Sequence, residues 1–456
     1  MTKMIARFVA RGMHPYNIVE EPGFLDMMKF AMPDYAVPSR TFSRAIIPDL
    51  YASSKEKVKK KLGDIFSSGV ESLSITSGGW TSWENDSYVC VTCHIMDSDF
   101  MQHVHALACT EMTDSHTAAN LELFITGVIE EWEIPAHDTV PIFVVTDNGR
   151  NFTSAVAGSS WNSVQCFGHT LQLCVSDAKR EVSGFLQLCA KARAIVATYK
   201  RSAKARGRLQ EIQRNMQLDP LEVTQDIPRR WNSEHAMMAR LVKFRTVITV
   251  ELSESDAVPN LNASEWKLMN AAVQVLKPPD HAITELSGDR YPTLSQVIPL
   301  LQCTEVVLVE LVLVSEGGEA ALLASSLLHS IKTRFPDILM SRFPALAILV
   351  DPRYKDVCYA ERPAKQWAFT LLTTAAGETV PVHQHGSATS ENSTCSADPS
   401  GDSVWSAFTH FSSRAHDQSS RTISDEAAAY LKMSVMLNDP QSNGCSLYSQ
   451  RQQKRL

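Results

Sequence analysis

The sequence lacks the marks of membrane and secreted proteins. No stretch of 18 apolar residues is free of charge, and the nearest one, around residues 306–314, contains Glu310. A membrane-spanning helix needs about 20 predominantly apolar residues, so we expect no membrane association. The N-terminus, MTKMIARFVARGMHPYNIVEE, has no long apolar core followed by a small-residue cleavage site. We therefore expect no secretion signal.

Paired cysteines and an excess of positive charge are also missing. The ten cysteines are scattered over 456 residues, which is typical of a reducing cytosolic or nuclear setting. The formal net charge is −7, which argues against a protein that binds polyanions over its whole surface but leaves a local basic face open. With 44% hydrophobic residues, the chain can bury one large core or two to three smaller ones.

The first 65 residues predict short helices, because four prolines (Pro15, Pro22, Pro33 and Pro38) punctuate them. Within this segment, the stretch 53–62 (SSKEKVKKKL) predicts a capped helix. This stretch contains five lysines, called here the lysine cluster: Lys55, Lys57, Lys59, Lys60 and Lys61. Such a cluster is either a solvated helix face or a contact for the DNA backbone.

Between residues 66 and 183 the pattern changes to that of strands alternating with helices. Three strands are predicted from β-branched and aromatic residues, at 70–76, 87–95 and 100–110. A helix then opens at Asp114 or Ser115, followed by the apolar run Val140–Thr146, which predicts a strand buried on both faces. Another helix starts near His169. This order predicts an RNase H-like α/β fold.

The remaining chain predicts mostly helix. Residues 184–375 carry long amphipathic segments with few strand signals. The stretch 376–424 is rich in Ser, Thr, Gly and Pro and predicts a disordered linker. Residues 425–456 predict a short, truncated C-terminal helix and a loose tail.

Two short motifs suggest chemistry, and each has a plain structural alternative. Asp147 directly follows the apolar strand, where a two-metal phosphoryl-transfer site of this fold places a carboxylate, although an Asp there also serves as a turn residue. The string 90–94 (CVTCH) matches a haem attachment motif. It lies inside a predicted strand, so we expect two ordinary packed cysteines instead of a haem site.

Six strings occur in one order along the chain and carry a family resemblance. They are ITSGGWTSWENDSYVCVTCHI, HTAANLELFITGVIEEWEI, VVTDNGRNF, CFGHTLQL, RRWNSEH and LKPPDHAITELSGDRYPTLSQVIPL. Together with the opening segment they resemble the hAT transposase superfamily, in its branch fused to BED-type zinc fingers, over roughly residues 5–435. The resemblance implies an RNase H-like catalytic core interrupted by a large all-α insertion domain, after an N-terminal helical segment.

The same resemblance implies that catalysis is lost. The first-strand motif of the family, Thr-Thr-Asp-x-Trp-Thr-Ser, reads TSGGWTS at residues 76–82, so Gly78 stands where the metal-binding Asp is expected. Asp147 matches the second carboxylate. The third, a Glu in a C-terminal dimerisation segment, is expected beyond the end of this chain. We therefore expect no cofactor, loss of the ancestral Mg²⁺ site and no DNA strand transfer.

The resemblance also marks residues of the helical region. Cys166 and His169 match a Cys-x-x-His motif of the family, for which half a zinc site and simple packing are the two interpretations. Trp231 matches a tryptophan that stacks on bases, with burial in a core as its alternative. Arg229 and Arg230 precede it and are expected, with the lysine cluster, to contact nucleic acid.

The sequence thus predicts a domesticated or decayed transposase-like protein that is not an enzyme and acts as a nuclear regulator. Its expected partners are DNA, bound weakly and without sequence preference, and other chromatin proteins. The Cys and His ligands of a BED finger do not occur before the core. Two alternatives stay open, namely a transposase whose active ends lie outside this chain and an interaction scaffold with no DNA contact. The oligomeric state is not predicted.

Overall fold

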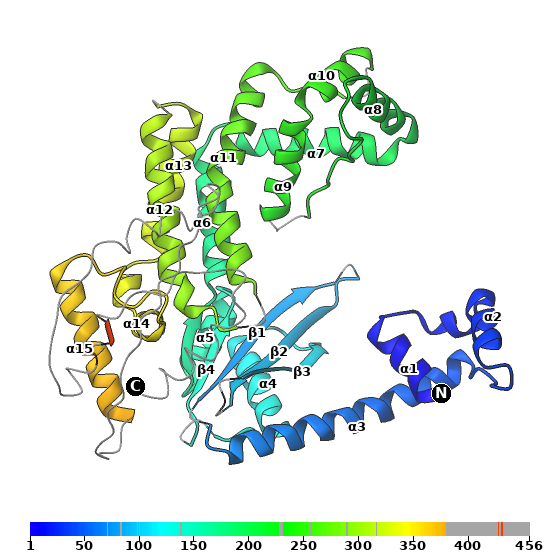
Figure 1. Cartoon of the computed structure of the whole chain (residues 1–456), viewed down its shortest axis with the longest axis vertical. Helices are drawn as coiled ribbons and strands as arrows, with labels where there is room; N and C mark the ends of the chain where they lie inside the picture. The colour runs from blue at the N-terminus through cyan, green and yellow to red at the C-terminus, as the bar shows by residue number, and fades with distance from the viewer. Residues whose placement is uncertain are drawn as a thin grey trace, which may run out of the picture. The chain divides into compact units, whose positions relative to one another are not determined.

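The computed structural model divides the chain into two compact units, Met1–Gln165 and Cys166–Leu456, called here the N-terminal and C-terminal units (Figure 1). It describes residues 1–70, 72–82, 84–97, 99, 101–136, 139–227, 231–255, 258–288, 291–315, 317–379, 427, 430 and 431. The division falls after Gln165, whereas the sequence suggests a domain boundary after residue 183. Residues 376–379 of the predicted linker are the end of helix α15 (Arg362–Thr379), so the linker prediction is wrong there. The rest of the linker and most of the predicted C-terminal helix lie outside the described residues.

The N-terminal unit opens with helices packed around a small apolar core of Ile5, Val9, Val19 and Met28. The elements are α1 (Thr2–Arg11), the 3₁₀ helix η1 (Tyr16–Glu20), α2 (Pro22–Ala31) and α3 (Arg40–Ser67). The predicted helix at 53–62 is only the middle of the 28-residue α3. That helix begins at the Ser39 cap, whose hydroxyl accepts a hydrogen bond from the backbone N–H of Phe42.

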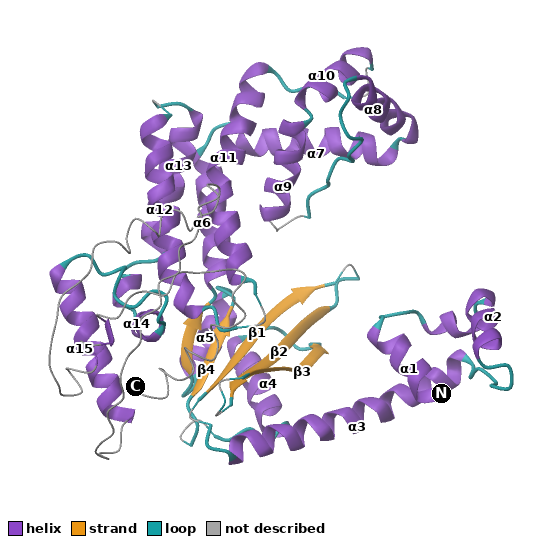
Figure 2. Ribbon diagram, viewed as in Figure 1, coloured by secondary structure: helices purple, strands orange, loops and turns teal. Residues whose placement is uncertain are grey.

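A five-stranded mixed sheet forms the centre of the same unit, in the order β3-β2-β1-β4-β5 (Figure 2). The strands are β1 (Leu73–Thr81), β2 (Ser87–Met96), β3 (Gln102–Glu111), β4 (Ile142–Thr146) and β5 (Asn162–Gln165). The first three are antiparallel to one another, and β4 pairs in parallel with both β1 and β5. The predicted mixed α/β architecture, with three antiparallel strands leading into a parallel one, is confirmed.

One face of the sheet is covered by two helices, α4 (Ala118–Glu131) and α5 (Arg150–Gly158). Ile125 of α4 packs in one apolar cluster with Ile75, Val91 and Val144 of the sheet. Burial alternates along β4, so the prediction that this strand is buried on both faces is wrong. Thr117 caps α4, three residues after the predicted Asp114. The sequence did not predict α5 or β5, because both are short and β5 carries polar residues.

The C-terminal unit is built from helices around one large apolar core throughout its described residues. They are α6 (Phe167–Glu181), α7 (Phe185–Arg201), α8 (Ala203–Asn215), α9 (Trp231–Lys243), α10 (Arg245–Glu254), α11 (Ala263–Leu286), α12 (Val297–Val314), α13 (Glu319–Arg334), α14 (Arg342–Val350) and α15 (Arg362–Thr379), with 3₁₀ helices Leu294–Gln296 and Ile338–Met340. Helix α6 begins close to the predicted His169.

One segment of this unit, Leu294–Val314, is long and apolar enough to cross a membrane by length and composition alone. The sequence analysis missed it because it required an uncharged run, whereas this window contains Glu305 and Glu310. In the structure, 44% of the window is buried inside the protein. More than half of the window is therefore not buried, and Leu313 and Val314 at the end of the segment are 74% and 80% exposed.

We predict that Ile125→Ala destabilises the N-terminal unit by about 2–5 kcal/mol, because it empties a fully buried site between α4 and the sheet. Leu123 lies two residues away on the same helix and is 73% exposed, so Leu123→Ala is the matched control and should change stability by less than about 0.5 kcal/mol. Chemical denaturation followed by circular dichroism measures both. Equal effects of the two variants would contradict the packing described here.

Candidate functional site

Asp147 and Gly78 occupy neighbouring positions on the two central strands. Ser77 of β1 pairs in parallel with Thr146 of β4, so the next residue on each strand is Gly78 on one and Asp147 on the other. Because Ser77 and Thr146 point toward the buried side, the next residues lie on the face opposite α4 and α5. The sequence predicts this arrangement, with the two positions no more than one or two strand spacings, about 5–10 Å, apart.

Asp147 also orders the turn that follows it. Its Oδ1 accepts a hydrogen bond from the backbone N–H of Gly149 at 2.9 Å. A Cβ on Gly149 would approach that oxygen to 2.8 Å, so a larger residue there would displace the Asp147 carboxylate from this position. Helix α5 begins at the next residue, Arg150. The turn role left open by the sequence is therefore present, and the half-buried carboxylate keeps its place at the end of the strand.

Gly78 leaves an open position beside this carboxylate. A Cβ built on it meets no atom within 4 Å. No group of three or more His, Cys, Asp or Glu side chains suited to a metal ion occurs among the described residues. A pair of Mg²⁺ ions requires several oxygen ligands, and Asp147 alone supplies one carboxylate at this point. Gly78 and Asp147 therefore do not fit a two-metal centre.

The lysine cluster on α3 is partly engaged within the N-terminal unit. Lys55 forms an ion pair with Glu131 and lies over the ring of Trp132, 5.2 Å from its centroid. The Nζ of Lys59 is 3.0 Å from Glu133 Oε1, and this hydrogen bond raises the pKa of Lys59. Pairing with a carboxylate competes with a phosphate contact, so Lys59 is a poorer candidate for DNA than the sequence suggests.

The other three lysines remain on the surface. Lys57, Lys60 and Lys61 are exposed. The Nζ of Lys61 is 3.1 Å from Nδ1 of His103, which is a weaker constraint than an ion pair. Lys57 and Lys60 are the members of the cluster best placed to meet an anion.

Trp231 has a packing role instead of the predicted base-stacking role. It is the first residue of α9, is 3% exposed and belongs to the core of the C-terminal unit. A ring covered on both faces offers no surface to a base, so this prediction is corrected. Arg229 and Arg230 lie outside the described residues.

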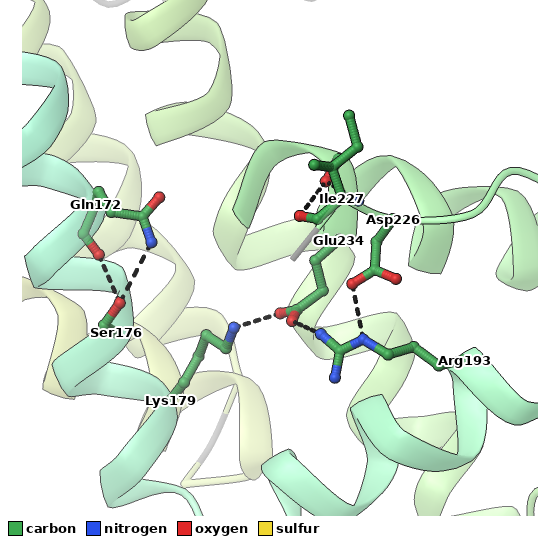
Figure 3. A network of polar contacts seen from close by, with 8 residues as sticks. Gln172, Ser176, Lys179, Arg193, Asp226, Ile227 and Glu234 are labelled. Carbon is green, nitrogen blue, oxygen red and sulfur yellow. Dashed lines mark hydrogen bonds and ion pairs between the residues drawn. The ribbon is translucent and has the colours of Figure 1, made fainter. Parts of the chain in front are cut away.

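A polar cluster that the sequence did not reveal holds the segment before Trp231 in place (Figure 3). The carboxylate of Glu234 on α9 pairs with Lys179 of α6, and its Oε2 lies 2.7 Å from Nη2 of Arg193 on α7. The same guanidinium donates from Nε to Asp226 at 2.7 Å. We call these four residues the Glu234 cluster. It joins two helices to the chain that leads into α9.

Both strings quoted from the helical region meet at a buried histidine. His235, one residue after Glu234, places Nδ1 3.1 Å from Asp280 Oδ2 and Nε2 3.1 Å from the carbonyl of Val273. Asp280 belongs to the LKPPDH string, where Pro278 and Pro279 interrupt the hydrogen bonding of α11. The spacing of His235 in RRWNSEH therefore serves to brace α9 against the irregular part of α11.

The remaining cysteine and histidine candidates lie in ordinary positions. Cys166 is the N-cap residue of α6 and His169 is in its first turn, and the carbonyl of Cys166 accepts a hydrogen bond from Thr170 Oγ1 at 2.9 Å. In β2, Cys93 is fully buried and burial raises its pKa to about 12, whereas Cys90 lies on the other face of the sheet. The two sulfurs of the CVTCH string therefore point in opposite directions.

We predict that Glu234→Gln lowers the free energy of unfolding of the C-terminal unit by about 2–4 kcal/mol. The change leaves Lys179 and Arg193 without their shared carboxylate, and the loss stays below that of a wholly buried pair because Arg193 is partly exposed. Glu222→Gln breaks the exposed pair with Lys200 and is the matched control, with an expected loss under about 1 kcal/mol. Urea denaturation compares them, and hydrogen exchange should quicken around Asp226 only in the first variant.

Comparison with known proteins agrees with this architecture. The family model described as the ZBED1 RNase-like domain matches residues 76–158, and the ZBED1 RNase-like helical domain matches residues 164–275. These matches cover most of the sheet and the helices from α6 to the middle of α11.

Among curated proteins, zinc finger BED domain-containing protein 4 of Homo sapiens is 29% identical over 381 residues, which cover 82% of this chain and 32% of that protein. Zinc finger BED domain-containing protein 6 of Homo sapiens is 27% identical and covers 78% of this chain and 38% of its own length. The putative AC transposase of Zea mays is 28% identical over 302 residues, which cover 61% of this chain and 36% of that protein. The chain thus spans about a third of the length of these relatives. These matches together support a hAT transposase-derived family of BED-finger proteins as the family that this chain resembles.

Proposed function

We propose that this chain is a catalytically inactive, transposase-derived protein that associates with DNA or chromatin in the nucleus and acts as a regulator. The observation that carries the proposal is Gly78, within β1, beside Asp147, directly after β4, where the family motif places metal-binding carboxylates. The relatives support a role other than transposition, since one of them is named putative transcriptional regulator tpeD, of Talaromyces stipitatus. We further propose that the helices from α7 to α15 form an insertion domain.

The argument for inactivity rests on ligand count. A Mg²⁺ ion keeps its own water shell unless oxygen ligands of the protein replace part of it in near-octahedral geometry. Glycine has no oxygen donor in its side chain, and the single carboxylate of Asp147 already accepts a hydrogen bond from Gly149. Phosphoryl transfer by two metals needs both ions held together, so this pair of positions does not supply it.

The proposed DNA contact rests on the exposed members of the lysine cluster, Lys57, Lys60 and Lys61, with Arg229 and Arg230 as further candidates from the sequence. Phosphate contacts of this kind release counterions and carry no base information. The net charge of −7 opposes binding elsewhere on the surface. We therefore propose weak binding without sequence preference.

The first prediction concerns metal binding. The unmodified chain should neither nick nor join DNA with Mg²⁺ or Mn²⁺, whereas Gly78→Asp should raise Mn²⁺ affinity at least about tenfold. The open space at position 78 admits the larger side chain, which would face Asp147 from the adjacent strand. Isothermal titration calorimetry or the electron paramagnetic resonance signal of free Mn²⁺ measures the change.

Two controls separate this effect from a general change in charge. Asp147→Asn combined with Gly78→Asp should abolish the gain, and Gly78→Asn should show none. Metal-dependent DNA cleavage by the unmodified chain that disappears in Asp147→Ala would falsify the proposal of inactivity.

The second prediction concerns DNA. Binding to unrelated duplexes should fall in the range of about 10⁻⁴ to 10⁻⁶ M at physiological salt and weaken steeply as salt rises. Lys57→Ala with Lys60→Ala should weaken it and flatten the salt dependence, whereas Lys55→Ala should act mainly on stability through Glu131 and Trp132. Fluorescence anisotropy at two salt concentrations tests this. Tight, sequence-selective binding with a shallow salt dependence would contradict it.

A further inference from the structure

A stacked aromatic pair, of which Trp80 is exposed, lies on the sheet next to the β1–β2 turn. Trp80 of β1 and Tyr88 of β2 are register partners, and their rings stack with centroids 5.6 Å apart and planes 16° from parallel. Trp80 is 48% exposed although it is the largest side chain type. Neither ring belongs to the described apolar clusters of the N-terminal unit. The pair therefore offers the open face of an aromatic ring to the solvent.

Three carboxylates surround this pair. Glu111 of β3 is the register partner of Tyr88, so Trp80, Tyr88 and Glu111 form one row across three strands. Glu84 and Asp86 lie in the β1–β2 turn, and their backbone N–H groups donate to Ser82 Oγ at 3.1 Å each, which fixes the turn. Burial and these three carboxylates raise the pKa of Tyr88, in agreement with their positions beside it in the row and in the adjoining turn.

Among the residues that the structure describes, no ion pair uses Glu84, Asp86 or Glu111. The ion pairs found among the described residues use other carboxylates, whereas Glu131 and Glu133 in the same unit each hold a lysine. Glu84 and Glu111 are exposed. The row therefore combines a flat π surface with several acceptors, and both attract a cation.

The stacked geometry selects among cations. Because the two rings lie nearly parallel, they present one outer face and form no cage of the kind that encloses a rounded ammonium group. A planar guanidinium can lie flat on such a face while its N–H groups reach carboxylates at the margin. Gly78, on the same face of β1, leaves open space beside Trp80 for the stem of a long side chain.

We propose that the row Trp80–Tyr88–Glu111, with Glu84 and Asp86, is a docking site for an arginine-containing basic segment of a partner protein. The arginine guanidinium lies on the free face of Trp80 and pairs with Glu84 or Asp86 of the β1–β2 turn. Glu111 lies beyond Tyr88, on the side away from that face, and adds longer-range attraction. A single-stranded nucleic acid also stacks on aromatic rings, but its phosphates would have to approach three uncompensated negative charges. The site is independent of the lysine cluster and of the proposed loss of catalysis.

The test uses the full chain and two fluorescein-labelled probes, a Gly/Ser peptide with four arginines and the same peptide with four lysines. Fluorescence anisotropy at physiological salt should give a dissociation constant of about 10⁻⁴ to 10⁻⁵ M for the arginine peptide and binding at least about fivefold weaker for the lysine peptide. Trp80→Ala should weaken the arginine peptide about tenfold or more, and Glu84→Gln about threefold or more.

Matched variants guard against nonspecific effects. Tyr51→Ala removes another exposed ring of the same unit, and Asp64→Asn another exposed carboxylate, and both should leave binding unchanged. Trp80→Phe keeps a ring and should retain part of the affinity, which separates loss of stacking from loss of folding. No binding of the arginine peptide, equal binding of both peptides, or an unaffected Trp80→Ala variant would overturn the proposal. Binding of oligo(dT) that depends on Trp80 would assign the row to nucleic acid instead.

Discussion

The parallel pairing of β1 with β4 is the constraint on which the rest of the N-terminal unit depends. It joins the antiparallel meander β1–β3 to the parallel part of the sheet and brings residues almost 70 positions apart in sequence to adjacent places. A shift of one residue in this register would turn Ile75 and Val144 away from Ile125 and expose the apolar side of both strands. The hydrophobic pattern that buries the helix face therefore also fixes the place of Gly78 beside Asp147.

In the C-terminal unit a polar interaction does comparable work. The helices there bury one large apolar core. Apolar contacts have little directionality, so they alone do not fix the path of a segment without regular structure, such as the one that includes Asp226 before α9. The Glu234 cluster fixes this path, because burying the Glu234 carboxylate is unfavourable unless Lys179 and Arg193 pair with it. His235 and Asp280 add a second fixed point one residue further on.

The sequence predicts the features that follow from periodicity and from ordered motifs. The strands β1 to β4 and the adjacency of positions 78 and 147 fall in this class. Features that depend on three-dimensional partners could not be predicted. The pairing of Lys59 with Glu133 joins helix α3 to the turn that follows α4. Burial decides the role of Trp231, although a base-binding and a packing tryptophan look the same in sequence. Short elements such as α5 and β5 carry too few residues to show a period.

The empty space around Gly78 bears on the evolutionary history of the chain. In most cores, removal of a side chain leaves a cavity, and selection for folding alone then retains the larger residue. A Cβ at position 78 meets no atom within 4 Å, so a side chain could be exchanged there without leaving a void. Removing an acidic group from the neighbourhood of Asp147 also relieves like-charge repulsion. Selection for folding alone would thus not retain a carboxylate at this position. The metal-binding residues of such a fold could be lost by mutation while the fold itself is kept.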